Sequence, residues 1–154
     1  MSSCFNPNKQ KFYAWGTVNP AGESDEYTGL FLTAADIQAV VRDNSLNGLP
    51  LKIEHCEPAV GTVITAWANA GKLDVLVEVD KKVLEGDVVT KFIQNKVCQD
   101  FSLGYTIGLA FSDAVGAYRP TKKIFNEVSI VRRGARPNTH IRGYTVLGDT
   151  TPKA

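Results

Sequence analysis

Residues Phe101 to Phe111 read FSLGYTIGLAF, a stretch in which large apolar side chains alternate with Ser, Gly and Thr. Because successive side chains of a β-strand point to opposite faces of its sheet, this alternation predicts a strand with one apolar face and one face of small residues. The small face carries Ser102, Gly104, Thr106 and Gly108. Positions without a side chain beside a serine leave room for another chain to approach.

Segments on both sides of this stretch complete a mainly β pattern. Further strands are predicted at residues 11–18, 49–55, 60–68, 72–80, 124–131 and 141–147. One helix is expected after an N-cap Thr33 with Asp36 three residues later, and a second within 81–98. The apolar stripe of the second helix, expected to face the core, is Val88, Val89, Phe92, Ile93 and Val97. Since the pattern shows no parallel βαβ alternation, it predicts a closed or nearly closed β-barrel flanked by helices.

Length and charge limit the classes of protein to which the chain can belong. Its 154 residues carry a formal net charge of +1 and no polybasic block, which argues against a nucleic-acid or an anionic membrane partner. Its apolar runs are too short for a membrane-spanning helix, and the N-terminus lacks the order of a signal peptide. We therefore expect a single domain over residues 1–154 that acts inside a cell, with an irregular tail at 148–154.

The cysteines give no sign of a disulfide framework or a structural zinc site. Cys4, Cys56 and Cys98 are odd in number and form no CxxC pair. A metal site built from both histidines, His55 and His140, with Cys56 and Cys98 is disfavoured, because adjacent ligands point to opposite faces of a strand. We expect no metal.

Two polar residues have both an ordinary and a chemical interpretation. Alternation places His55 on the face of Leu51 and Ile53, away from the adjacent Glu54, which therefore cannot easily orient the imidazole. A single histidine on an apolar face is most often a packed core residue, and the alternative is a general base. Ser102 is likewise either an ordinary strand serine or a nucleophile. The chain has no GxSxG elbow, which argues against an α/β-hydrolase.

Glu127 lies in phase with Phe125 and Ser129 on the predicted strand 124–131. A carboxylate between apolar neighbours loses hydration unless it finds a proton donor or a cation. Glu127 is therefore either a strand-edge residue in water, a partner of a nearby arginine, or the third member of a triad. In the triad it would accept a hydrogen bond from His55 and stabilise the imidazolium.

Three blocks of the chain occur in the order of a known family. They are LPLKIEHCEPAVGTV (Leu49 to Val63), FSLGYTI (Phe101 to Ile107) and EVSIVRRGARPNTHI (Glu127 to Ile141). The first resembles the catalytic-histidine segment of the herpesvirus assemblins. The second resembles the nucleophile segment, in the F-S-x-G-Y form of the tailed-phage prohead proteases, and the third resembles the phage block that opens with a Glu. The resemblance to these capsid maturation proteases extends from about Trp15 to Ile141.

Matched residue by residue, the resemblance implies that Ser102 is the nucleophile and His55 the general base. Glu127 falls where the herpesvirus enzymes have a second histidine and the phage enzymes an acid, which implies a Ser-His-Glu triad. His140 is the second candidate for the third role. For the oxyanion hole, the family uses a backbone amide after a glycine within an Arg-Arg pair. Here this implies the amide of Arg136, with Ala135 in the place of the first arginine.

The resemblance implies a single serine endopeptidase domain of the assemblin barrel type, without a metal or organic cofactor. Such an enzyme cleaves scaffold protein and its own precursor during capsid or prohead maturation. Its partners would be the scaffold (assembly) protein as a peptide substrate and the capsid precursor. Its location would be the site of capsid assembly, in the nucleus for a herpesvirus or the bacterial cytoplasm for a phage. Family members release themselves by cutting after alanine, so Ala154 is either the P1 residue of a self-cleavage or an arbitrary end.

Two other functions stay open. One is a catalytically inactive capsid-binding or scaffold-binding barrel with the same fold. The other is a cysteine hydrolase that uses Cys98 or Cys56 with His140.

The chain is shorter than the herpesvirus assemblins and lacks the helices that build their activating dimer. The resemblance therefore leaves both a monomer and a homodimer open.

Overall fold

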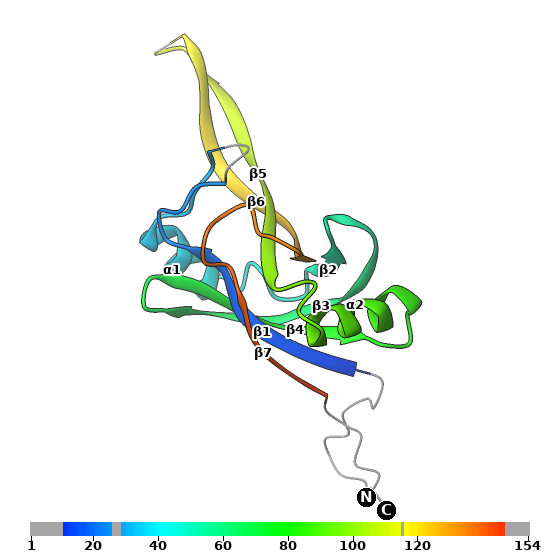
Figure 1. Cartoon of the computed structure of the whole chain (residues 1–154). Coiled ribbons are helices and arrows are strands. Elements are labelled where there is room, and N and C mark those ends of the chain that lie inside the picture. The colour runs from blue at the N-terminus through cyan, green and yellow to red at the C-terminus, as the bar shows by residue number, and fades with distance from the viewer. Residues whose placement is uncertain (1–10, 26–28, 115, 147–154) are drawn as a thin grey trace, which may run out of the picture.

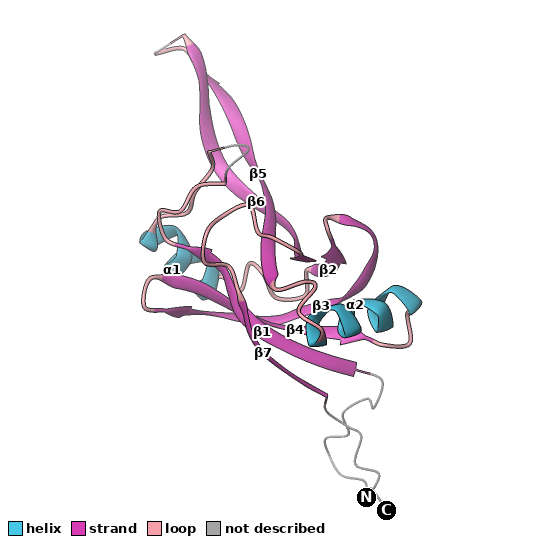
Figure 2. Ribbon diagram, viewed as in Figure 1, coloured by secondary structure: helices cyan, strands magenta, loops and turns pink. Residues whose placement is uncertain are grey.

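The computed structural model describes residues 11–25, 29–114 and 116–146, and both Cys4 and the expected self-cleavage residue Ala154 lie outside them. The elements in chain order are β1 (Lys11–Pro20), α1 (Ala34–Arg42), β2 (Pro50–Ile53), β3 (Cys56–Asn69), β4 (Lys72–Asp80), α2 (Leu84–Gln94), β5 (Asp100–Ser112), β6 (Ala117–Val131) and β7 (Ile141–Val146). The mainly β fold with two flanking helices is confirmed (Figure 2). No helix in the described part of the chain is long and apolar enough to cross a membrane.

The seven strands form one sheet in the order β5-β6-β2-β3-β4-β1-β7. The expected closed or nearly closed barrel is not confirmed, because a barrel needs a hydrogen-bonded ladder between its edge strands. The described parts of β5 and β7 share no such ladder. An isolated bridge between Asp100 and His140 links the start of β5 to the residue before β7. Beyond it, β5 and β6 leave the other strands as a long projecting hairpin (Figure 1).

The centre of the sheet brings three segments together that are far apart in the sequence. β2 pairs in parallel with β6, in a register that sets Leu51 opposite Val128. β6 pairs in antiparallel with β5, so that Ser102 lies opposite Ser129. The ends of β2 and β6 and the start of β5 are therefore neighbours.

A local signal explains why α1 begins where it does. The N-cap of α1 is Thr33, and the expected capping box is present: Asp36 N donates to Thr33 Oγ1 over 3.0 Å, and Thr33 N donates to Asp36 Oδ2 over 2.9 Å. Both helices pack against β3 and β4. The buried core beneath them includes Ile37, Val40, Val60, Val63, Val75, Val77, Val89 and Ile93.

The apolar stripe expected on α2 is confirmed only in part. Val89 and Ile93 are buried, but Val88, Phe92 and Val97 are 38%, 37% and 43% exposed. Gly86 and Thr90 take the other core-facing positions of the helix. A Cβ on Gly86 would collide with the carbonyl oxygen of Asp80, so the helix packs more closely on that side than its apolar pattern indicates.

Candidate active site

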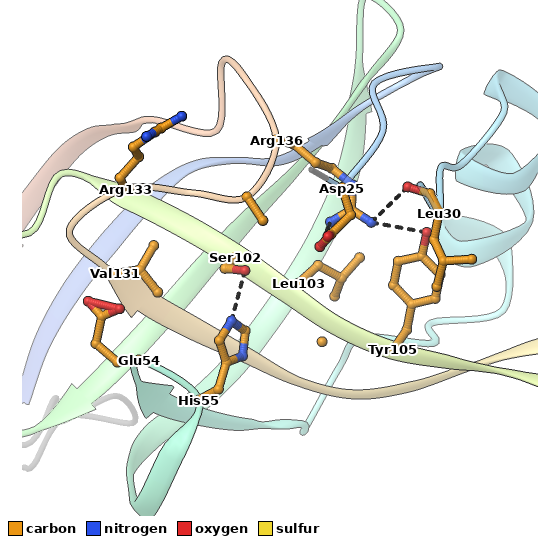
Figure 3. Close-up of a pocket in the computed structure, with 12 residues that line it drawn as sticks. Asp25, Leu30, Glu54, His55, Ser102, Leu103, Tyr105, Val131, Arg133 and Arg136 are labelled. Carbon is orange, nitrogen blue, oxygen red and sulfur yellow. Dashed lines mark hydrogen bonds and ion pairs between the residues drawn. The ribbon is translucent and has the colours of Figure 1, made fainter. Parts of the chain in front are cut away.

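The three residues of the predicted triad meet at the surface where β5, β6 and β2 adjoin. Ser102 lies on β5, Glu127 on β6, and His55 in the turn after β2. The His55 Nε2 to Ser102 Oγ distance is 3.0 Å, and His55 Nδ1 contacts Glu127 Oε1. Figure 3 shows the imidazole of His55 pointing at the Ser102 hydroxyl. These contacts form a chain of hydroxyl, imidazole and carboxylate in the order that nucleophilic catalysis requires.

The backbone at His55 differs from the expected strand. β2 ends at Ile53, and Glu54 and His55 have φ angles of 48° and 61°. Since Ile53 pairs with Cys56, these two residues form a tight turn in which both φ angles are positive, the geometry that usually selects Gly or Asn. The side chain of His55 is 45% exposed rather than packed in the core.

Hydrogen bonds to β6 hold this unfavourable turn in place. Glu54 N donates to Ile130 O over 3.1 Å, and His55 N donates to Ser129 Oγ over 3.0 Å. A non-glycine residue in the left-handed region costs on the order of 1–2 kcal/mol, so the surrounding contacts must supply that free energy. Such strain occurs preferentially at functional sites. The turn aims the imidazole away from β2 and over β5.

Glu127 is 8% exposed and receives two hydrogen bonds, one for each oxygen. His55 Nδ1 binds Oε1, and Ser129 Oγ donates to Oε2 over 2.7 Å. The alternative of a glutamate in water is therefore wrong. At Gly104 the small face of β5 has a different use from the expected one. A Cβ on Gly104 would collide with Glu127 Oε1, so the space beside Ser102 is filled by the carboxylate rather than left for another chain.

The electrostatics of the site favour a basic imidazole. The hydrogen bond with Glu127 raises the pKa of His55 above its ordinary value, although partial burial of the ring opposes the shift. The charges of Glu127, Glu54 and Asp25 add to the increase. With Glu127 accepting from Nδ1–H, the lone pair of neutral His55 lies on Nε2, where it can take the Ser102 proton.

Ser129 is a site residue to which the sequence assigns no role. It is fully buried, and its hydroxyl accepts from His55 N while donating to Glu127 Oε2. One side chain thus fixes both the turn that carries the base and the carboxylate that orients it. The available signal was its position two residues after Glu127, on the same face of the strand.

The β6–β7 loop (residues 132–140) lines the cleft on the side opposite His55. The cleft has a volume of about 290 Å³ and is lined by Asp25, Leu30, Glu54, His55, Ser102, Leu103, Gly104, Tyr105, Val131, Arg133, Ala135 and Arg136. The Arg136 side chain extends toward Leu30 and Tyr105 and is 5% exposed. Its Nη2 donates to Leu30 O over 3.2 Å and to the Tyr105 hydroxyl over 3.1 Å (Figure 3). Ala135 and Arg136 therefore lie on the cleft wall, as an oxyanion hole requires.

Residues of the alternative sites lie in other surroundings. His140 Nδ1 donates to Asp100 Oδ1 over 2.8 Å, so its carboxylate partner differs from that of His55. Cys98 is buried, and burial raises the pKa of its thiol, which disfavours a thiolate nucleophile. The exposed Cys56 donates to Glu54 O over 3.3 Å. These contacts give no support to a cysteine hydrolase that uses His140.

Comparisons with known proteins link the fold to one group of enzymes. No protein-family model and no curated protein sequence matches the chain. Among solved structures, Kaposi's sarcoma-associated herpesvirus protease with a hexapeptide phosphonate inhibitor matches with a TM-score of 0.59 and 16% identity, over 88% of this chain and 65% of that one. Varicella-zoster virus protease matches with a TM-score of 0.55 and 17% identity, over 87% of this chain and 64% of that one. The Kaposi's sarcoma-associated herpesvirus protease bound to a dimer disruptor matches with a TM-score of 0.56 and 17% identity, over 89% and 77%.

This chain spans less than two thirds of the length of the first two of these proteases. The resemblance to phage prohead proteases is not supported by these matches and stays a prediction. At 16–17% identity, the matches establish one property of the chain, which is that it has the fold of the herpesvirus proteases.

Proposed function

We propose that this chain is a serine endopeptidase with Ser102 as nucleophile, His55 as general base and Glu127 as the residue that orients the base. One observation carries the proposal: the imidazole of His55 lies 3.0 Å from the Ser102 hydroxyl and contacts Glu127 through its other nitrogen. The assignment is supported by the fold, which is that of the herpesvirus proteases.

The proposed reaction proceeds in two halves. Ser102 Oγ attacks the carbonyl carbon of the scissile peptide while His55 Nε2 takes the hydroxyl proton. His55 then gives this proton to the leaving amine, and the peptide C–N bond breaks to leave an acyl group on Ser102. A water molecule, deprotonated by His55, hydrolyses the acyl-enzyme and restores the serine. In both halves Glu127 stabilises the imidazolium that forms.

Negative charge on the carbonyl oxygen needs donors from the opposite wall of the cleft. Arg136 and Ala135 lie on that wall, and their backbone amides are the proposed oxyanion donors. One such donor typically lowers the barrier by about 3–4 kcal/mol.

An extended peptide is the substrate that the cleft fits best. β5 is an edge strand of the sheet, so a substrate can pair with it as an additional strand across Ser102. By the family resemblance, the substrates would be a scaffold protein, with a small P1 residue, and the enzyme's own precursor. The enzyme would act at the site of capsid assembly, in the host nucleus or the bacterial cytoplasm. A homodimer is the proposed assembly, since two of the similar structures are herpesvirus proteases bound to dimer disruptors.

Digestion of a peptide library of mixed sequence tests the proposal with no single substrate chosen in advance. Purified chain and its Ser102→Ala variant are each incubated with the library, and mass spectrometry identifies new peptide ends. We expect new ends that follow small residues with the wild type and none with Ser102→Ala. If the folded wild type produces no ends beyond those of the variant, the chain is not an endopeptidase and the inactive binding domain is favoured.

A further inference from the structure

The start of β5 is fastened to the segment 134–141, directly beside the proposed nucleophile. Backbone hydrogen bonds of 2.8 Å run from Phe101 N to Thr139 O and from Ile141 N to Gln99 O. Asp100, between these two attachment points, pairs with His140 in the isolated bridge. The strand that carries Ser102 and the end of the β6–β7 loop are thus parts of one hydrogen-bonded unit.

The side chain of Asp100 extends this connection to the other half of the loop. It is 9% exposed, and its Oδ2 accepts from Gly134 N over 2.8 Å. Its Oδ1 accepts from His140 Nδ1 over 2.8 Å. A buried carboxylate is unfavourable without such donors, and here each oxygen has one.

Close packing leaves the loop little freedom at Gly134. A Cβ at this position would collide with Thr139 Oγ1 and lie 3.0 Å from Phe101 O. Thr139 Oγ1 in turn donates to Arg136 O over 3.3 Å. Gly134 and Arg136, which flank Ala135, are therefore both held by groups attached to the start of β5.

We propose that Asp100 is a positioning residue, which sets the backbone amides of Ala135 and Arg136 at a fixed distance from Ser102 through its hydrogen bond with Gly134. The inference rests on the proposed serine endopeptidase. Asp100 and Ser102 are two residues apart on one strand, so a shift of the carboxylate moves the oxyanion donors relative to the nucleophile. A misplacement of about 1 Å at such a site can cost about 100-fold in rate.

His140 completes the arrangement from the outer side of the loop. Its side chain is 64% exposed, and it lines a second cavity on the other side of Ala135 and Arg136, which Ser102 does not line. His140 therefore fixes the rotamer of Asp100 without contact with the proposed reaction centre.

The inference is tested with replacements of Asp100 that change either its shape or its charge. Asp100→Asn keeps the shape of the side chain. Its Oδ1 accepts from Gly134 N, and its Nδ2 donates to His140 Nδ1 when the His140 ring carries its proton on Nε2. Asp100→Glu keeps the charge but displaces the carboxylate by one methylene, and Asp100→Ala removes the contact. Peptide hydrolysis gives kcat and KM for each variant, and hydrogen exchange followed by mass spectrometry measures the protection of the amides of residues 134–136.

We expect kcat to fall about 10–100-fold in Asp100→Ala and Asp100→Glu with KM nearly unchanged, because oxyanion contacts form in the transition state. Exchange at 134–136 should be faster in both variants, and Asp100→Asn should stay within about threefold of the wild-type kcat. If Asp100→Ala does not fold, Asp100→Glu carries the test. The role of Asp100 would be overturned by an unchanged kcat in Asp100→Ala and Asp100→Glu. It would also be overturned if kcat falls while hydrogen exchange at residues 134–136 stays the same. If the wild type shows no hydrolysis that depends on Ser102, the proposed function is overturned instead. The hydrogen-exchange result then shows only whether Asp100 holds the loop at residues 134–136.

Discussion

The carboxylate of Glu127 occupies the space that a side chain on Gly104 would need. Both residues lie opposite each other on neighbouring strands, Glu127 on β6 and Gly104 on β5. Because His55 and Ser129 each bind one oxygen of Glu127, a methyl group at residue 104 can be accommodated only if the carboxylate leaves at least one of them. The glycine is thus part of the site, because the absence of its side chain makes room for the Glu127 carboxylate.

Gly104→Ala should therefore lose activity and keep its fold. We expect kcat to drop by about 100-fold, since the imidazole loses its fixed orientation. Only the carboxylate end of the flexible Glu127 side chain has to move, and the backbone can stay in place. The thermal midpoint should therefore change little. Peptide hydrolysis and a melting curve check both parts. Wild-type turnover in a variant that melts normally would show that Glu127 does not need its present position.

Glu127→Gln should lower kcat by about 10⁴-fold, by analogy with acid-to-amide changes in other triads. It should also shift the pH profile. A hydrogen bond with Glu127 raises the pKa of His55, and catalysis needs the neutral imidazole. Removal of the negative charge lowers this pKa, so the acid limb of kcat/KM moves to lower pH. An acid limb that stays in place would mean that Glu127 does not govern the titration of His55.

Ser129→Ala should reduce kcat/KM by about 10–100-fold, because two hydrogen bonds that orient the base and its partner are lost, each worth about 0.5–1.5 kcal/mol. Ser129→Thr keeps the hydroxyl in a residue suited to strands and should recover most of the activity. Steady-state kinetics of both variants provide the comparison. Equal losses in Ala and Thr would point to packing rather than to the hydroxyl.

The Asp74–Arg142 pair, remote from the cleft, predicts a pH-dependent stability. Burial alone would raise the pKa of Asp74, but hydrogen bonds from Arg142, Thr17 and Asn69 outweigh it, so the pKa is lowered. A lowered folded-state pKa gives stability that is present above the unfolded pKa of about 3.9 and is lost as the pH falls through the folded value.

Arg142→Met should therefore destabilise the protein at pH 7 by about 2 kcal/mol, less than for a fully buried pair because the Arg142 side chain is 41% exposed. Urea unfolding at pH 7 and at pH 3 checks the prediction. The difference from the wild type should shrink at pH 3. Arg42→Met removes the exposed contact with Asp43 and is the matched control, with no measurable effect expected. A difference that is constant with pH would remove Asp74 from the explanation.

Strand periodicity was sufficient to predict the strands that carry Ser102 and Glu127, and the faces on which both residues lie. It is a local property: a period of two needs only the residues within one strand. The capping box of Thr33 and Asp36 is predictable for the same reason, since both hydrogen bonds join residues three apart.

The position of His55 could not be predicted in this way. Glu54 and His55 adopt positive φ angles that their residue types disfavour, and bonds to Ile130 and Ser129, more than 70 residues away, hold them there. The wrong expectation that the strand continues to His55 came from extending the alternating pattern through this turn. The prediction of a closed barrel was not confirmed for a related reason. Closure depends on the pairing of β5 with β7, which no local pattern specifies.

In the proposed mechanism His55 activates Ser102, and covalent labelling by an alanyl phosphonate reports on this step without a peptide substrate. We expect one adduct per chain, located on Ser102 by peptide mass spectrometry. We also expect the second-order rate constant of labelling to fall by about 10²–10⁴-fold in His55→Ala. Labelling of another residue, or labelling of Ser102 at the wild-type rate in His55→Ala, would show that His55 does not activate Ser102.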